Sequence, residues 1–331
     1  MNKKLSMAAL LLACISCGAL AADPRVFGPG IISGAANEAS PVFAPDGNTV
    51  YFTRSNSSDN VILVSQRLGD GWSAPRIAPF SGRWRDLEAA MAPDGSYLVF
   101  ASSRPVPETG KQPDGFWGGT LHVGRGGNLW RVDRIKTGSG WSEPKHLPTV
   151  VNRNGSTFGP SVTADGDLYF TDVFGDSKRA HLFHAAYKDG AYQAPEPMPF
   201  TDERWSDVDE TVAADGSFMV FSSTRPPTPP QQMDLFIVFR GKDGSWGEPQ
   251  HLPDSINRLD GIIEARLGPD GHTLYFTSSY ETAVSYPKDA AGAAASLKDM
   301  AWNDGNFNIW TVDISDILAA GRGVESRPPP G

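Results

Sequence analysis

Cysteine is nearly absent from this chain of 331 residues, and its two copies, Cys14 and Cys17, both lie close to the N-terminus. Residues 1–21 combine a positive start, a short apolar run and an Ala19-Leu20-Ala21 ending, which is the pattern of a cleaved signal peptide. We therefore expect the mature chain to begin near Ala22, to contain no cysteine, and to be periplasmic or secreted. A chain without cysteine has no disulfide, thiol nucleophile or cysteine-ligated metal.

A lipid anchor remains an alternative for this leader. Leu11-Leu12-Ala13-Cys14 resembles a lipobox, in which Cys14 would carry the lipid, although Leu12 is atypical at its position. No other apolar stretch approaches the length of a transmembrane helix, so we expect no membrane span.

Positive charge is also scarce, with 29 basic against 38 acidic residues and a net charge of -9. An acidic protein repels phosphate backbones, so we expect no nucleic-acid partner. The sequence has no zinc signature, phosphate-binding loop or nucleophile elbow. We expect no cofactor, although loop acids such as Asp59 and Asp70 leave structural calcium open.

Glycine (35) and proline (27) are abundant, as expected of many short strands joined by turns. One pattern occurs five times: an apolar strand, an Asp-Gly pair, and a second apolar strand that ends in Ser, Thr or Arg. The pairs are Asp46-Gly47, Asp94-Gly95, Asp165-Gly166, Asp215-Gly216 and Asp270-Gly271. Asp accepts local backbone hydrogen bonds and Gly supplies a positive φ, so each pair predicts a hairpin.

Two further strands follow each hairpin. The third strands are expected at residues 61–64, 128–132, 181–184, 234–238 and 308–312. The fourth are expected at Trp72-Ser-Ala-Pro75, Trp141-Ser-Glu-Pro144, Tyr192-Gln-Ala-Pro195 and Trp246-Gly-Glu-Pro249. Four strands repeated about every 50 residues is typical of a β-propeller. We predict an all-β fold: a single five-bladed propeller of four-stranded antiparallel blades over residues 22–316, followed by a flexible tail at 317–331.

The fifth unit lacks its own fourth strand. Residues 26–32, near the N-terminus, resemble the fourth strands of the other units. We predict that this segment completes the fifth blade, with Ile31 paired to the stretch around Trp310. Such closure removes the open sheet edges that invite aggregation.

These repeats resemble the TolB-like (WD40-like) β-propeller repeats of the TolB C-terminal domain. The resemblance covers nearly all of the mature chain and implies the propeller fold. It implies little about function, because such repeats serve scaffolds, sensors and enzymes alike. No segment resembles the separate N-terminal α/β domain of TolB, so a role in the Tol system is not implied.

The two longest insertions, residues 105–127 and 280–305, are predicted to lie on one face of the propeller, together with the connections between blades. We call this the long-loop face and expect binding there, because the opposite face has only short turns. Aromatic residues in the insertions form a lid over this face or are buried under their own loops. They are Phe116, Trp117, His122, Tyr280, Tyr286 and Trp302.

Charged residues recur where each innermost strand begins and each second strand ends. The candidate ligand-binding residues are Trp84, Arg85, Asp86, Glu88, Arg104, Trp205, Asp207, Asp209, Arg225 and Glu264. The other interpretation of these acids and arginines is that they form ion pairs that fasten the ring. The third unit departs from the pattern, since it has Thr157 and Gly159 in place of acids and Asp172 in place of arginine.

Two functions remain open from the sequence. The first is a binding module for a protein, peptide or glycan on the long-loop face. The second is a glycan-acting hydrolase or lyase in which Glu88, Asp209 and Glu264 are the catalytic candidates, because glycoside hydrolysis needs paired carboxyl groups. A purely structural assembly module would have no pocket for a small ligand.

Overall fold

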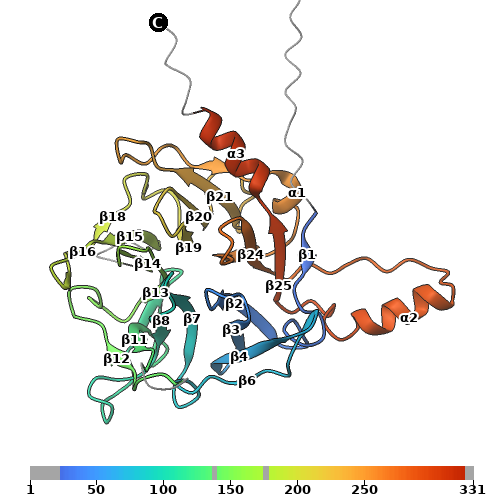
Figure 1. The fold of residues 1–331 in the computed structure, drawn as a ribbon, viewed down its shortest axis with the longest axis horizontal. Coiled ribbons are helices and arrows are strands. Elements are labelled where there is room, and N and C mark those ends of the chain that lie inside the picture. Colours follow the sequence, from blue (N-terminus) through green and yellow to red (C-terminus); the bar gives the residue numbers. More distant parts are fainter. Residues whose placement is uncertain (1–22, 136–139, 174–178, 325–331) are drawn as a thin grey trace, which may run out of the picture.

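The computed structural model describes residues 23–135, 140–173 and 179–324, and in this part of the chain five antiparallel blades surround a central axis (Figure 1). The prediction of an all-β, five-bladed propeller is confirmed. The expected signal peptide, including Cys14, lies outside the described residues. No helix among the described residues is long and apolar enough to cross a membrane.

Each blade runs outward from an innermost strand. Blade one comprises β2 (Asn37–Phe43), β3 (Thr49–Ser55), β4 (Asn60–Leu68) and β6 (Arg76–Ile77), with β5 (Gly71–Trp72) paired to the end of β4. Blade two comprises β7 (Asp86–Met91), β8 (Tyr97–Ser102), β11 (Asn128–Asp133) and β12 (Lys145–His146). Blade three comprises β13 (Thr157–Val162), β14 (Leu168–Asp172), β15 (His181–Ala185) and β18 (Glu196–Pro197), and β16 (Tyr187–Lys188) pairs with β17 (Ala191–Tyr192) beside it.

The last two blades complete the circle. Blade four comprises β19 (Asp207–Val212), β20 (Phe218–Ser223), β21 (Asp234–Phe239) and β22 (Gln250–His251). Blade five comprises β23 (Ile263–Leu267), β24 (Thr273–Ser278), β25 (Asn308–Asp313) and the N-terminal β1 (Arg25–Val26).

The Asp-Gly pairs form the predicted hairpin turns. In blade one, Asp46 Oδ1 accepts a hydrogen bond from the backbone N–H of Asn48 at 2.9 Å, and Gly47 has a φ of 68°. The outer strands, by contrast, begin later than expected. In blade one the outermost strand is β6, directly after Pro75, because proline has no N–H to donate to a strand ladder.

The N-terminal strand closes the ring, but not through the residue that the sequence suggested. Val26 lies opposite Trp310, whereas Ile31 is 41% exposed and outside the strand pairing. The chain turns at Gly28, whose carbonyl accepts the N–H of Ile32 at 2.8 Å. This turn ends the strand early and buries Ile32 in the apolar cluster that joins blades one and five.

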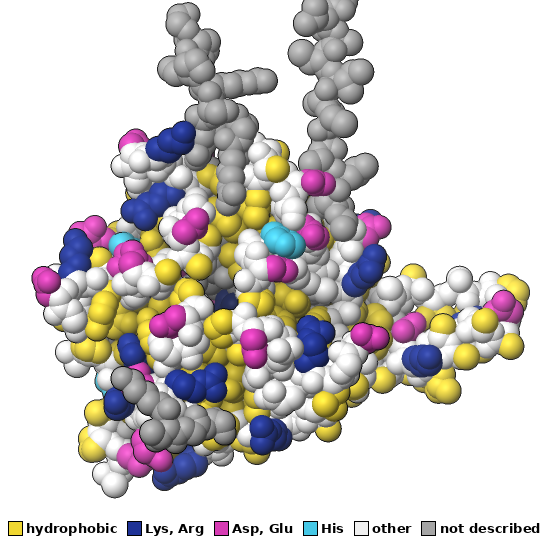
Figure 2. Space-filling model, viewed as in Figure 1, with side chains coloured by type: hydrophobic (Ala, Val, Ile, Leu, Met, Phe, Trp, Pro, Cys, Tyr) yellow, Lys and Arg dark blue, Asp and Glu magenta, His cyan; other side chains and the backbone are white. Residues whose placement is uncertain are grey.

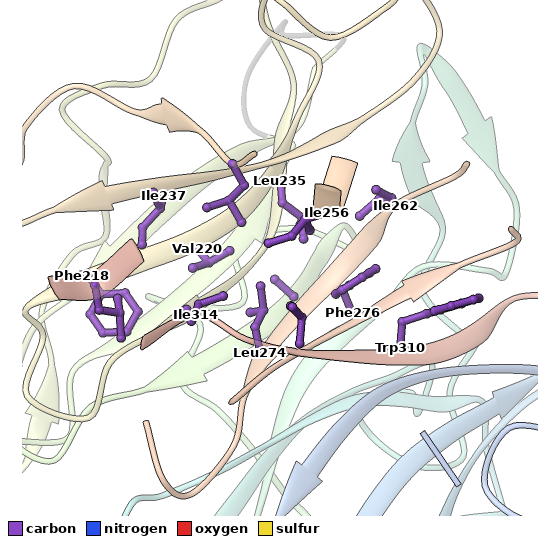
Figure 3. Close-up of a cluster of buried hydrophobic side chains, with 14 of the residues drawn as sticks. Phe218, Val220, Leu235, Ile237, Ile256, Ile262, Leu274, Phe276, Trp310 and Ile314 are labelled. Atoms are coloured by element: carbon purple, nitrogen blue, oxygen red, sulfur yellow. The ribbon is translucent and has the colours of Figure 1, made fainter. Parts of the chain in front are cut away.

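The hydrophobic core lies between neighbouring blades. One cluster joins side chains of blade four, such as Val220 and Leu235, to side chains of blade five, such as Leu274 and Phe276 (Figure 3). Fully burying one such side chain stabilises the fold by about 1.5–3 kcal/mol. The ring is therefore held by contacts between blades as well as by strand pairing within them.

Three helices lie at the periphery. α1 (Asp254–Asn257) and α3 (Ser315–Val324) pack on blades four and five, and Leu318 of α3 is buried in their shared core. The predicted propeller boundary at residue 316 therefore falls inside α3, and residues 317–324, which we assigned to a tail, are helical. α2 (Ala290–Asp299) extends away from the body and carries exposed apolar side chains (Figures 1 and 2).

Candidate functional site

One position of every innermost strand has a left-handed backbone. We call these five residues, one from each blade, the axial ring. Their φ values are 47° at Ser40, 53° at Glu88, 56° at Gly159, 56° at Asp209 and 59° at Glu264. Each lies where the pairing register shifts by a β-bulge. Left-handed backbone favours glycine, and only blade three has glycine there.

The carboxyl groups of the axial ring approach one another. Glu88 Oε2 accepts the backbone N–H of Gly159 at 2.6 Å. A β-carbon on Gly159 would lie 3.2 Å from Asp209 Oδ1, so the glycine separates the two acids without filling the space between them. The third acid, Glu264, accepts the hydroxyl of Ser40 from the neighbouring blade.

Burial raises the pKa of all three acids. The pKa of Glu88 is well above its usual range because of burial and the nearby charges of Asp209 and Glu264. Burial, followed by repulsion from Glu264, raises the pKa of Asp209 to about 7. Burial also raises the pKa of Glu264, although the Ser40 hydroxyl and Arg266 oppose the shift. The ring therefore holds acids that are costly to ionise.

Positive charge beneath the ring is insufficient to neutralise it. Arg266 is 4% exposed, and its Nη1 donates to the carbonyl of Ala265 at 2.7 Å, while its Nε and Nη2 have no hydrogen-bond partner among the described residues. The same guanidinium influences all three acids and also Glu210, whose pKa burial raises to about 8. One guanidinium thus faces four carboxyl groups.

A cavity of about 420 Å³ opens above this ring, on the long-loop face, and we call it the axial cavity. Glu88 and Asp209 are among the residues that line it. Phe116, Trp117 and Phe158 contribute aromatic surface. The cavity therefore combines apolar walls with a small number of polar groups, which is the usual composition of a small-ligand site.

The first insertion forms one wall of the axial cavity. Its hairpin, β9 (Gly115–Trp117) and β10 (Thr120–His122), is anchored where the Ser156 hydroxyl accepts the N–H of Phe116 at 2.6 Å. A β-carbon on Gly155 would lie 2.1 Å from the Asp114 carbonyl oxygen, so glycine is required for this close approach. The wall is held against blade three by direct backbone packing.

Two arginines also line the axial cavity. Arg85 precedes β7, and Arg125 belongs to the first insertion and donates to the carbonyl of Ser57. Among the described residues, neither guanidinium forms an ion pair with a carboxylate. Burial lowers the pKa of Arg85, and the positive charge of Arg125 lowers it further. The nearby charge of Asp59 opposes this shift but does not outweigh it, so two guanidinium groups without an ion pair line the cavity together with the ring acids.

Several other candidates from the sequence are engaged in ion pairs within their own blades. Arg225 Nη2 contacts Asp207 at 2.6 Å, and the Asp207 carboxylate also accepts the Ser223 hydroxyl at 2.6 Å. Asp86 and Arg104 form the same arrangement in blade two, with 3.7 Å between Arg104 Nη2 and Asp86 Oδ1.

Blade three has this ion pair with its charges exchanged. Asp172, at the end of the second strand, contacts Arg153 at 3.0 Å and accepts an N–H of Asn154 at 2.8 Å. Blade three therefore keeps an ion pair at this position, Asp172 with Arg153, although it departs from the repeat and has Gly159 in the axial ring.

The remaining candidates do not line the axial cavity. Trp84 and Trp205 are partly buried in the connections before β7 and β19. In the second insertion, Tyr280 and Trp302 pack around Trp310, with ring centroids 5.8 and 6.0 Å away, and Tyr286 is exposed on the projecting arm. The aromatic wall therefore comes from the first insertion, where the His122 ring stacks on Trp117 at 3.8 Å.

Sequence reasoning missed part of the cavity lining. The residues directly before the axial ring are apolar and line the cavity in four of the five blades. They are Leu87, Phe158, Val208 and Ile263. Their repeated position before the ring acids was a usable signal, whereas Arg125 is brought to the cavity by the path of an irregular loop.

No group of three or more His, Cys, Asp or Glu residues in the described ranges is arranged to hold a metal ion. The ring acids are thus near enough to repel one another but do not form a coordination sphere. Their counter-charge must come from Arg266, from protons or from a ligand.

No known protein family matches this sequence, and no curated protein matches it. Among solved structures, TolB from Acinetobacter baumannii is 14% identical, with a TM-score of 0.46, over 84% of this chain and 54% of that chain. A GH62 hydrolase in complex with xylotriose is 10% identical over 87% and 97%, with a TM-score of 0.48. The calcium-binding protein regucalcin from Agrobacterium tumefaciens is 14% identical over 88% and 93%, with a TM-score of 0.44. At these identities, similarity does not indicate what this chain binds.

Proposed function

We propose that this chain is an exported binding propeller that captures a peptide or a glycan in the axial cavity on its long-loop face. One observation carries the proposal: Glu88 and Asp209 have left-handed backbones at enclosed positions and line a cavity with aromatic walls. The leader sequence supports export, and the one-sided distribution of loops supports binding on this face.

Stability alone does not account for acids at these positions. A left-handed backbone costs a non-glycine residue roughly 1–3 kcal/mol when the surroundings hold it there. Burial and mutual repulsion add to the cost at Glu88 and Asp209. Gly159 shows that the fold accepts glycine at this position. Residues that break local rules without a structural gain are expected at functional sites.

The size of the cavity limits its occupant. A volume of about 420 Å³ lies within the range of small-ligand pockets, roughly 300–1,000 Å³. A folded partner cannot enter such a space. The occupant is therefore a small molecule or the end of a longer peptide or glycan, and a protein partner would insert one terminus.

The test compares cavity variants with variants elsewhere on the same face. Wild-type protein is immobilised and exposed to peptide and glycan arrays, alongside Glu88→Gln, Asp209→Asn and Trp205→Ala. We expect ligands that wild type and Trp205→Ala retain and that both acid variants lose. Equal retention by all four proteins would show that the cavity is not the binding site.

Catalysis is a second candidate, favoured by the two carboxyl groups with raised pKa values on either side of Gly159. One protonated and one ionised carboxyl group is the arrangement that glycoside hydrolysis uses. A polysaccharide panel incubated with wild type, Glu88→Gln and Asp209→Asn tests this candidate. Absence of any product with wild type would exclude it, and wild-type turnover that both variants abolish would support it.

A further inference from the structure

The axial cavity has opposite charges at its two ends. Arg85 lies three residues before Glu88 on the chain that enters β7, so it is nearer to the long-loop face. Three residues of extended chain span roughly 10 Å. The guanidinium groups of Arg85 and Arg125 thus mark the outer part of the cavity, and the carboxyl groups of Glu88 and Asp209 mark its floor.

The floor has an excess of negative charge. Glu88, Asp209, Glu264 and Glu210 share the single guanidinium of Arg266, which lies beneath the ring. Without a ligand, protonation of these carboxyl groups must offset the remaining negative charge. A cationic group placed among Glu88 and Asp209 would gain both attraction and hydrogen bonds, because charge-assisted hydrogen bonds are about twice as strong as neutral ones.

The outer part of the cavity has an excess of positive charge. Arg85 and Arg125 repel each other, the nearby charge of Asp59 offsets this only in part, and neither arginine forms an ion pair among the described residues. A carboxylate between them would remove that repulsion and accept hydrogen bonds from a guanidinium in the paired geometry that arginine favours. The rings of Phe116, Trp117 and Phe158 leave an apolar surface between the two charged regions.

From these three observations we infer that the ligand is a short peptide with free ends, whose α-ammonium group binds Glu88 and Asp209 and whose carboxylate binds Arg85 and Arg125. The inference deepens the proposed binding function and rests on it. An extended chain advances about 3.3–3.6 Å per residue, so a span of roughly 10 Å corresponds to two or three residues. A neutral glycan would leave both sets of charges without a partner.

The charges also predict how binding depends on pH. Arg266, Glu264 and Glu210 are the charged groups that face Glu88 and Asp209. Binding should strengthen as pH rises through about 7, where Asp209 ionises. It should weaken above about 8, where a peptide α-amino group loses its proton. A glycan lacking an amine would show no upper limit of this kind.

The experiment uses the mature protein and an equimolar mixture of short peptides, two or three residues long, in three forms: free, N-acetylated and C-amidated. Retained members are identified by mass spectrometry, and their affinities are then measured by calorimetry. We expect N-acetylation to weaken binding at least tenfold. Amidation should weaken it about tenfold in wild type and by less than twofold in the double variant Arg85→Ala/Arg125→Ala, which lacks both contacts to the carboxylate.

Two variants distinguish a loss of charge from a loss of the folded structure. Glu88→Gln and Asp209→Asn change charge with little change in shape, and each must keep the circular dichroism spectrum and melting transition of a folded propeller. Loss of short-peptide binding by both folded variants supports the inference. Equal binding of free and N-acetylated peptides, or retention of no short peptide by wild type, would overturn it.

The outcome for the proposed function is separable. If wild type retains glycans that Asp209→Asn does not, and neither protein retains short peptides, the cavity is a binding site but the peptide inference is wrong. If no peptide or glycan distinguishes wild type from the cavity variants, the proposed function fails as well.

Discussion

The carboxylate of Glu88 in blade two accepts the backbone N–H of Gly159 in blade three at 2.6 Å, across the blade boundary. Both residues have a left-handed backbone, with φ values of 53° at Glu88 and 56° at Gly159. It also places Gly159, which has no side chain, beside Asp209. The opening between two acids thus depends on the smallest residue of the axial ring.

Gly159→Ala should therefore reduce both stability and ligand capture. The new β-carbon would lie 3.2 Å from Asp209 Oδ1, and its backbone would remain left-handed. Gly69→Ala is the matched control, because Gly69 has a φ of 57° and open space around its β-position. We expect about 1 kcal/mol of destabilisation for the control and at least about 2 kcal/mol for Gly159→Ala, measured by urea unfolding.

If both substitutions cost the same free energy and leave binding intact, the glycine serves only the backbone conformation. The crowding at Asp209 would then be relieved by side-chain movement.

Asp209→Asn should stabilise the protein at neutral and higher pH. The folded-state pKa of Asp209, about 7, is above the unfolded value near 3.9, so the folded state binds more protons between these values. Stability contributed by this group is present at low pH and is lost as pH rises from about 4 to 7. Each unit of pKa shift corresponds to about 1.4 kcal/mol.

Thermal unfolding of wild type and Asp209→Asn at pH 4 and pH 8 checks this sign. We expect the variant to gain at least about 1.4 kcal/mol relative to wild type between the two pH values. A variant that is relatively less stable at pH 8 would mean that the ionised carboxylate is well solvated or paired in the folded protein.

Arg225→Ala should be strongly destabilising, because it leaves the buried carboxylate of Asp207 without its guanidinium partner. Removal of one partner from a buried pair typically costs about 3–5 kcal/mol. Arg204→Ala is the control, since Arg204 pairs with Asp202 at the surface. Exposed pairs contribute about 0–1 kcal/mol. Similar unfolding free energies for the two variants would contradict a fastening role for Arg225.

Ring closure is testable with two neighbouring residues. Ile32→Ala should cost about 2–4 kcal/mol, because the side chain is fully buried where blades one and five meet. Ile31→Ala should change the unfolding free energy by less than about 1 kcal/mol, because Ile31 is 41% exposed. A larger loss at Ile31 than at Ile32 would show that the segment pairs as the sequence first suggested.

The blade pattern could be predicted from the sequence because it depends on local chemistry. The Asp46-Gly47 turn and its four counterparts specify hairpins through a side-chain oxygen and a positive φ within a few residues. The shared position of Glu88, Asp209 and Glu264 on the innermost strands could also be predicted, because the repeat placed them at one register. The end of β1 could not, because it depends on where Ile32 finds a buried site.

The candidate site also has features that the sequence predicts and features that only the folded chain shows. The five blades, the position of the axial acids and the face with long insertions could be predicted from the sequence, since each is set by a repeated spacing or by strand direction. Which of the charged side chains form ion pairs depends on the tertiary structure. Arg104 and Arg225 meet acids of their own blades, whereas Arg85 and Arg125 meet across a loop that no spacing describes. Ion pairing depends on distances in space, and those arise only when the blades close into a ring.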